Sequence, residues 1–184
     1  MIFERVGPND GLLEREIEKL ACVSKQLNED LVQELLVSHA KTDLEEFCFM
    51  VSMKRLKEAH STLASILSHT EPVLVSSAIA RHFLDLYRLI LFAEKRENYS
   101  WPAIKQLAEN LNLGLGKTAK FLGFSFKGEG RVLNHVAVYD VEKLEKILER
   151  LYWLDLAVKS SSTPKLVLHS FLNDLERILG DEER

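Results

Sequence analysis

The segment Gly114-Leu115-Gly116-Lys117-Thr118 comes nearest to a motif with chemistry, because it matches the last residues of a phosphate-binding P-loop. A P-loop also needs a glycine five residues before the glycine that precedes the lysine, so that backbone N–H groups can surround the phosphates. That position is Leu111, and residues 103–111 have the apolar spacing of a helix rather than of the buried strand that precedes a P-loop. We therefore interpret the glycines as the end of one helix and a tight turn into the next.

The remaining reactive residue types do not have the spacing of a catalytic or metal site. Ser160-Ser161-Ser162 lacks the strand–turn–helix setting of a nucleophile elbow, and consecutive acidic residues point in different directions on a helix. Cys22 and Cys48 form no C-x-x-C pair and lie within apolar faces, which is typical of small core residues. No two of the histidines are spaced as ligands on one helix face: His39, His60, His69, His82, His135 and His169. We predict no catalytic residue, no metal ligand and no cofactor, and hence that this chain is not an enzyme by itself.

Composition indicates a soluble globular protein, since 46% of the 184 residues are hydrophobic and 28% are charged. The length suits one domain, or one domain with part of a neighbour. A net charge of -4 and a pI of about 5.9 argue against free-standing nucleic-acid binding, which usually requires a basic domain. No apolar run reaches the ~18 residues of a membrane span, and the first residues do not open a signal peptide, so we expect a cytoplasmic protein with no membrane contact.

Apolar residues recur close to every 3.6 positions through most of the chain, which predicts an all-α helical bundle. Thr42 and Glu45 have the spacing of a capping box, Asp140 is a predicted N-cap, and three prolines fit first helical turns. We expect about nine helices, over residues 11–25, 28–36, 42–51, 54–68, 72–95, 102–112, 115–124, 140–158 and 163–178.

Residues 72–95 form the most apolar of these segments, with apolar side chains over more than one stripe, and we predict that they are the central helix of the bundle. Arg81, Asp85 and Arg88 lie on one polar edge of it, at positions i, i+4 and i+7. We interpret them first as a solvated network of ion pairs, in which each pair contributes about 0.2–0.5 kcal/mol.

Residues 124–139 are the least regular part of the chain. Val132, Val136 and Val138 favour extended structure, while Lys127-Gly128-Glu129-Gly130 is typical of a turn. We expect a small hairpin or a long loop in this segment.

Residues 102–124 also have the outline of a helix-turn-helix unit, with a short turn at Leu113-Gly114. A recognition helix there would present Lys117, Thr118 and Lys120 to the major groove of DNA. The acidic net charge and the lack of arginine in that helix argue against this function. A helix-turn-helix DNA-binding regulator remains one alternative, and a helical adaptor of unknown partner remains another.

Two stretches of the sequence resemble the bacterial DNA polymerase III delta subunit, a member of the clamp-loader family. Residues 148–159, Leu-Glu-Arg-Leu-Tyr-Trp-Leu-Asp-Leu-Ala-Val-Lys, are similar to the penultimate collar helix of that family, a leucine-rich helix that ends in Asp-x-x-x-Lys. Residues 6–20, Val-Gly-Pro-Asn-Asp-Gly-Leu-Leu-Glu-Arg-Glu-Ile-Glu-Lys-Leu, resemble the helix that closes the lid domain. The Ala80-Arg81-His82-Phe83 and Tyr87-Arg88-Leu89 segments of the central helix also look like the family's collar.

The resemblance implies that residues 1–39 are the end of an AAA+-like lid domain and that residues 40–184 are a helical collar domain. The chain would be a non-catalytic assembly module of the clamp loader, the ring that loads the sliding clamp onto DNA during replication. Its partners would be gamma/tau-like and delta-prime-like subunits. It would contact the sliding clamp only through an N-terminal domain that this sequence lacks, and it would contact DNA only indirectly. The sequence would then be either part of a longer protein or a shortened relative of the delta subunit.

Four residues are candidates for the subunit interface implied by this resemblance: Arg81, Arg88, Asp155 and Lys159. Asp155 and Lys159, at i and i+4, can form an intrahelical pair on the solvent side or reach a neighbouring helix and set its register. We favour the intrahelical pair, because exposed pairs contribute only about 0.2–1 kcal/mol.

Overall fold

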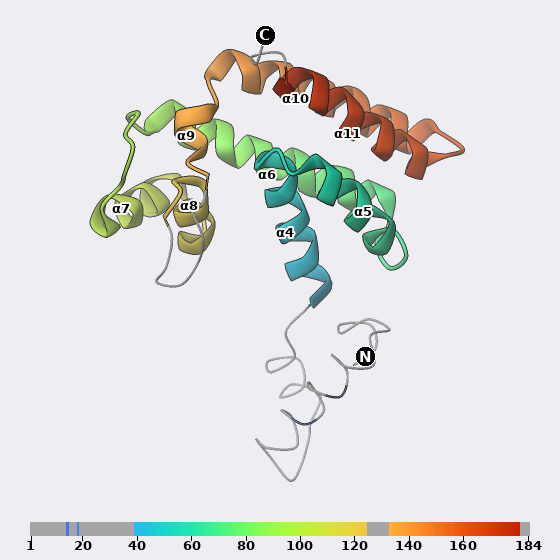
Figure 1. The fold of residues 1–184 in the computed structure, drawn as a ribbon, viewed down its shortest axis with the longest axis horizontal. Helices are drawn as coiled ribbons and strands as arrows, with labels where there is room; N and C mark the ends of the chain where they lie inside the picture. The colour runs from blue at the N-terminus through green and yellow to red at the C-terminus, as the bar shows by residue number, and fades with distance from the viewer. Residues whose placement is uncertain (1–13, 15–17, 19–38, 125–132, 181–184) are drawn as a thin grey trace.

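A computed structural model describes residues 14, 18, 39–124 and 133–180, and within these ranges it contains eight helices with defined bounds (Figure 1). They are α4 (His39–Ser52), α5 (Leu56–Ile66), α6 (Pro72–Phe92), α7 (Trp101–Leu111), α8 (Leu115–Phe121), α9 (His135–Val138), α10 (Val141–Ser160) and α11 (Pro164–Gly180). The described residues contain no strand, so the predicted all-α class is confirmed. The helices predicted over 11–25 and 28–36 lie outside the described residues. Of the helices that are described, none has the length and apolar content needed to cross a bilayer.

Helix α6 is the central helix, as its apolar content predicts. Pro72 occupies its first turn, where the N–H that proline lacks would have no intrahelical partner. Helices α4, α7, α9, α10 and α11 all pack against α6. Figure 1 shows α10 running antiparallel along α6, and α11 running antiparallel along α10. The side chains that α6 buries between these neighbours are Val75, Ser76, Ile79, His82, Phe83, Leu86, Leu89 and Ile90.

Helix α10 begins where the sequence predicts. The Oδ1 atom of Asp140 accepts a hydrogen bond from the backbone N–H of Lys143 at 2.7 Å, which satisfies one of the donors that a helix start leaves unpaired. The buried face of α10 then repeats at helical spacing through Leu144, Ile147, Leu151, Leu154 and Val158. Each fully buried leucine or isoleucine contributes roughly 1.5–3 kcal/mol, so this face is the main attachment of α10.

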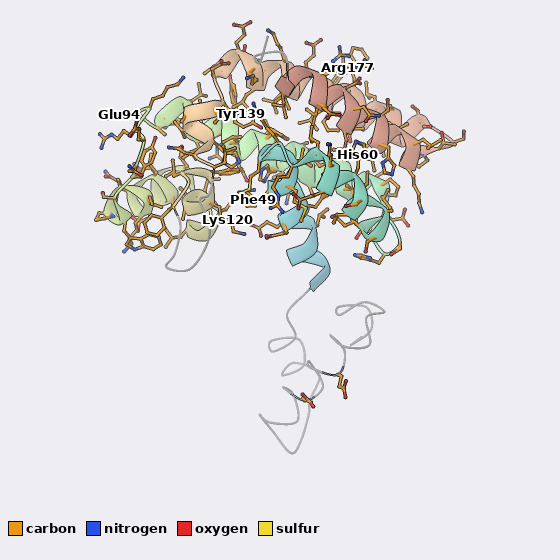
Figure 2. All side chains as sticks on the ribbon, in the orientation of Figure 1. Phe49, His60, Glu94, Lys120, Tyr139 and Arg177 are labelled. Carbon is orange, nitrogen blue, oxygen red and sulfur yellow. The ribbon has the colours of Figure 1, made fainter. Side chains whose placement is uncertain are left out.

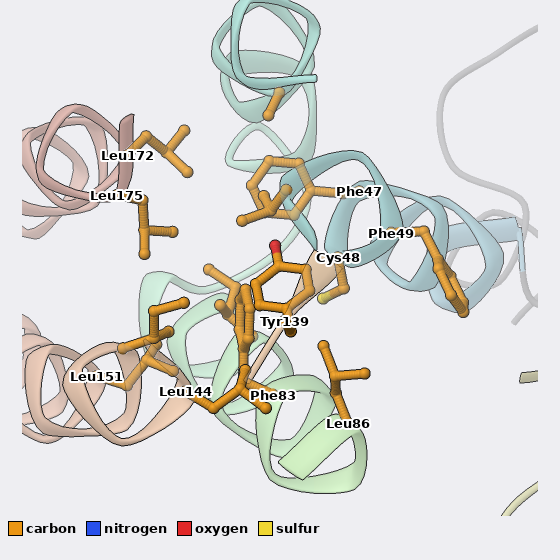
Figure 3. Close-up of a cluster of buried hydrophobic side chains, with 14 of the residues drawn as sticks. Phe47, Cys48, Phe49, Phe83, Leu86, Tyr139, Leu144, Leu151, Leu172 and Leu175 are labelled. Atoms are coloured by element: carbon orange, nitrogen blue, oxygen red, sulfur yellow. The ribbon is translucent and has the colours of Figure 1, made fainter. Parts of the chain in front are cut away.

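Aromatic and leucine side chains fill the space between α4, α6 and α10 (Figure 3). Phe47, Phe83 and Tyr139 are all at most 1% exposed. The ring of Tyr139 lies among these apolar groups with its hydroxyl directed toward α4, where it donates a hydrogen bond to the carbonyl oxygen of Ser52 at 2.7 Å. Burial of such a hydroxyl is tolerated because it is hydrogen-bonded.

Helix α4 starts earlier than the sequence predicts. The capping-box spacing of Thr42 and Glu45 places the N-terminus at Thr42, but α4 begins at His39, so Thr42 lies inside the helix. Residues at i and i+3 are also neighbours along the surface of a continuing helix, so this spacing alone does not fix a helix start.

In the segment predicted to be a small hairpin or a long loop, the described residues 133–139 are partly helical instead of extended. Val136 and Val138 belong to the short helix α9, which is capped by Asn134: its Oδ1 atom accepts from the N–H of Val136 at 3.1 Å. Within the described residues, the predicted hairpin is reduced to a single antiparallel bridge between Leu122 and Asn134. Strand propensity reflects packing on a half-buried surface, so a cap and tertiary contacts outweigh it here.

The bridge requires glycine at position 123. Gly123 has a φ of 70°, a left-handed conformation that favours glycine. A Cβ atom there would also lie 3.0 Å from the backbone of Asn134. Gly123 therefore allows the chain after α8 to pass close to Asn134.

A chain of buried hydrogen bonds connects α4, α6 and α9. The Oγ atom of Ser52 lies 2.8 Å from the Nε2 atom of His82 and 2.9 Å from the Nε2 atom of His135. The Nδ1 atom of His135 faces two carbonyl oxygens, those of Phe121 at 3.2 Å and Leu133 at 3.1 Å, so it carries the proton. The Nε2 atom of His135 then accepts from Ser52, whose hydroxyl also lies 3.2 Å from the carbonyl oxygen of Phe49. The Oγ atom of Ser52 accepts from the Nε2–H of His82.

This arrangement requires a neutral His135, and the neutral form of His82 is favoured because its Nδ1 atom is buried without a hydrogen-bond partner. Burial, reinforced by the positive charge of Lys117, lowers the pKa of His82 well below its ordinary value. Burial lowers the pKa of His135 to about 4. The unfolded chain, in which histidine titrates near pH 6.5, therefore binds more protons than the folded chain over the range between these values.

We predict that folding stability falls as the pH is lowered from about 6.5 toward 4, by up to ~1.4 kcal/mol per pH unit for each neutral buried histidine. The contribution of these neutral histidines to the free energy of unfolding is fully present above pH 6.5 and is lost as the pH falls through their folded-state pKa. NMR titration of the ring carbons should give a midpoint near 4 for His135. Urea denaturation of a His69→Asn variant, which changes an exposed histidine, should retain the wild-type pH dependence. A His135 midpoint near 6.5 would contradict the proposed hydrogen-bond chain.

Candidate docking surface

The contact between Ser52 and two histidines has the residue types of a nucleophile and its base, but its position excludes catalysis. Ser52, His82 and His135 are each at most 1% exposed. The rings of Phe49 and Phe121 lie 4.8 Å from the His82 ring, centroid to centroid, and enclose it edge-on. A substrate cannot reach the Ser52 hydroxyl, so this group of residues holds helices together.

The other reactive residues are also placed for structure. Cys48 is buried in the core, as predicted, and burial raises its thiol pKa to about 12, so the nucleophilic thiolate is absent at neutral pH. Cys22 lies outside the described residues. In the part of the chain that the structure describes, no group of three or more His, Cys, Asp or Glu side chains could hold a metal ion.

The P-loop-like segment forms the turn between α7 and α8. Asn112 ends α7 in the left-handed conformation, with a φ of 51°, and Gly114 is the N-cap of α8. The prediction of a helix end followed by a tight turn is therefore confirmed, although asparagine, not glycine, adopts the left-handed conformation. Asn tolerates this conformation better than most other residues.

The three predicted DNA-reading residues are committed to contacts within the protein. Thr118 is buried, and its hydroxyl donates to the carbonyl oxygen of Gly114 at 3.1 Å. Lys117 donates to Asp85 of α6 at 2.7 Å. The third residue, Lys120, pairs with Glu46 at 3.2 Å, and its Nζ atom lies 5.0 Å from the centre of the Phe49 ring (Figure 2). Helix α8 is thus packed inward, and the structure does not support a recognition helix at residues 115–121.

The predicted ion-pair network of α6 is present in part: Asp85 and Arg88 form a pair, Arg81 lies outside it, and each of the paired residues also bonds to another helix. Asp85 pairs with Lys117, and these two side chains are only 17% and 19% exposed. Arg88 donates to the carbonyl oxygen of Leu111 at the end of α7 and lies 3.9 Å from Asp85. Arg81 is exposed and forms no hydrogen bond or ion pair with the described residues. Asp85 and Arg88 therefore fasten the α7–α8 pair to α6, a long-range role that spacing within one helix cannot reveal.

Helix α10 exposes a group of large side chains opposite its buried face. Tyr152 is 60% exposed, Trp153 is 56% exposed and Leu156 is 43% exposed; we call these three residues the aromatic patch. The rings of Tyr152 and Trp153 lie edge to face, with centroids 5.4 Å apart. Leu166, in the first turn of α11, is also largely exposed. Sequence reasoning placed Tyr152 and Trp153 in the most specific segment of the resemblance but did not select them, because a single sequence does not show which helix face lies outward.

The two charged interface candidates of α10 lie beside the aromatic patch. Lys159 donates to Asp155 at 2.6 Å along the same helix, and both side chains are solvent-exposed, which is the intrahelical arrangement favoured by the sequence. Aromatic residues surrounded by polar groups are typical of protein–protein contacts, in which Trp, Tyr and Arg contribute most of the binding energy. The geometry fits a docking surface better than a site for a small molecule.

We predict that Lys117→Ala lowers the free energy of unfolding by about 1–2 kcal/mol, because it removes the closer of the two cations beside the mostly buried Asp85 carboxylate. Lys105→Ala is the matched control: it removes an exposed pair with Glu109 at 3.9 Å on α7, and it should cost less than ~0.5 kcal/mol. Urea denaturation of both variants measures the difference. Equal losses would show that the Lys117–Asp85 pair does not hold α8 to α6.

Comparison with known proteins gives a likeness of fold. No protein-family model and no curated protein matches the chain. Among solved structures, the fold is similar to that of the Bacillus subtilis DNA clamp loader delta protein, with a TM-score of 0.59 and 21% sequence identity. The match covers 96% of this chain and 49% of that protein, so the chain spans about half the length of the protein it matches. The predicted resemblance is confirmed at the level of the fold.

Proposed function

We propose that this chain is a non-catalytic assembly module of a bacterial clamp loader, related to the delta subunit. The observation that carries the proposal is the fold match to a clamp loader delta protein over 96% of the chain. The P-loop-like segment has Leu111 where the motif requires glycine, and Ser52 is buried. Both observations agree with a role in which this chain makes and breaks no covalent bonds. In this proposal the chain holds its subunit in the ring that loads the sliding clamp onto DNA.

The proposed mechanism is lateral packing of helices between neighbouring subunits. A stable interface of this kind buries about 800 Å² on each partner, around an apolar centre with a polar rim. The aromatic patch provides the apolar centre, and the Asp155–Lys159 pair provides part of the rim. Both lie on α10, whose opposite face is fixed to α6, so the patch is presented on a rigid element.

The domain assignment and the partners belong to the same proposal. Residues 40–184 act as the collar domain, and residues 1–39 belong to the preceding lid domain. The partners are gamma/tau-like and delta-prime-like subunits in the cytoplasm. Contact with the sliding clamp and with DNA depends on other parts of the complex.

We predict that the purified chain binds clamp-loader subunits of its own organism. Tyr152→Ala with Trp153→Ala should weaken this binding at least ~30-fold, since even one buried aromatic anchor contributes about 2 kcal/mol or more. Leu115→Ala is the matched control, because Leu115 is an exposed apolar residue on α8, away from the patch. Size-exclusion chromatography and calorimetry measure the association. If the folded wild-type chain binds no loader subunit, the proposed function is wrong; if the control weakens binding as much as the double variant, the patch is not the contact.

A further inference from the structure

Helix α6 has a second exposed surface, distinct from the aromatic patch. From residue 74 to residue 91, the exposed positions of α6 form a single line along the helix. Its members, which we call the α6 seam, are Leu74, Ser77, Arg81, Leu84, Arg88 and Leu91. The three leucines are 58%, 49% and 52% exposed, in chain order.

The spacing of the α6 seam alternates between three and four residues over its whole length. This is the 3.5-residue repeat with which one helix packs along another, each side chain fitting between side chains of its partner. The seam spans about 26 Å at 1.5 Å per residue, which corresponds to more than two heptads. Scattered exposed leucines are common on protein surfaces, but an apolar residue at each end and in the middle of one continuous line fits the contact face of a helix.

The neighbours of α6 fix the direction in which the seam faces. On one side of the helix, the hydroxyl of Tyr87 donates to Glu145 of α10 at 3.1 Å. On the other side, Asp85 accepts a hydrogen bond from Lys117 of α8 at 2.7 Å. The seam lies between these two attachments and opposite the buried face, so α6 cannot rotate to cover it.

The charge of the α6 seam indicates the chemistry of its partner. Its two charged positions are both arginines, one heptad apart, or about 10.5 Å along the axis. Arg81 has no partner among the described residues, and the carboxylate nearest in sequence, Asp85, is taken by Lys117 at 2.7 Å. The side chain of Arg88 is 50% exposed, although its guanidinium group donates to Leu111 and lies 3.9 Å from the carboxylate of Asp85. Guanidinium groups pair best with carboxylates, because two parallel N–H···O bonds can form.

We infer that the α6 seam binds an amphipathic α-helix of another protein, one that has apolar residues in heptad spacing and acidic residues seven positions apart. The apolar residues would cover Leu74, Leu84 and Leu91, and the carboxylates would pair with Arg81 and Arg88. This inference goes beyond the proposed function, because it concerns a different surface and does not depend on which complex the chain joins.

The test uses the full chain and two designed peptides of four heptads that differ only in charge. One peptide has glutamate at two positions seven residues apart beside its leucine stripe, and the other has lysine at both. We expect the glutamate peptide to bind about fivefold to tenfold more tightly than the lysine peptide, as measured by fluorescence anisotropy. Arg81→Glu should abolish this preference, because the seam then has one negative and one positive charge, and Leu84→Ala should weaken binding of both peptides.

Arg150→Glu is the matched control, since Arg150 is exposed on α10 outside the seam and its change alters the net charge equally. It should leave the peptide preference unchanged, and Tyr152→Ala with Trp153→Ala should also leave it unchanged. Circular dichroism confirms that each variant is folded. The inference is overturned if the glutamate peptide does not bind, if both peptides bind equally, or if Arg150→Glu acts like Arg81→Glu. It is also overturned if the seam residues instead mediate self-association or DNA binding that the glutamate peptide does not displace.

Discussion

The burial of α6 on three sides is the constraint on which the rest of the structure depends. Its apolar residues extend around most of the helix, so they can leave water only if several helices pack on them at once. Helix α10 covers one side, α4 and α9 cover another through the Ser52–His82–His135 hydrogen bonds, and α7 and α8 are tied to it through Leu111 and Lys117. Between residues 74 and 91, the exposed positions of α6 are those of the α6 seam.

The same packing explains why the chain fits docking better than catalysis. The buried side chains of Ser52, His82 and His135 hold helices together, and the fixed helices α6 and α10 expose aromatic residues, leucines and charged groups. A rigid helix that exposes such residues can bind another helix with little loss of conformational freedom. The likeness of fold to a clamp loader delta protein agrees with this interpretation.

The sequence predicted most of the described fold, because the signals for it are local. Apolar spacing identified α5–α8, α10 and α11, and Asp140 marked the start of α10. The predictions from sequence were wrong where residues far apart in the chain determine the local structure. Asp85 and Arg88 bond to α8 and α7 as well as to one another, and Asn134 caps a helix where valines favoured a strand. The aromatic patch was missed for a related reason: which face of α10 lies outward is determined by α6 and α11.

Hydrogen–deuterium exchange of the full chain, with and without purified clamp-loader subunits, tests most directly the central claim that exposed faces of the fixed helices dock onto other proteins. The account predicts slower exchange in peptides from residues 148–160 when the subunits are added, and unchanged exchange in residues 101–121. Protection confined to residues 101–121, or no protection anywhere in a chain that is folded, would contradict it.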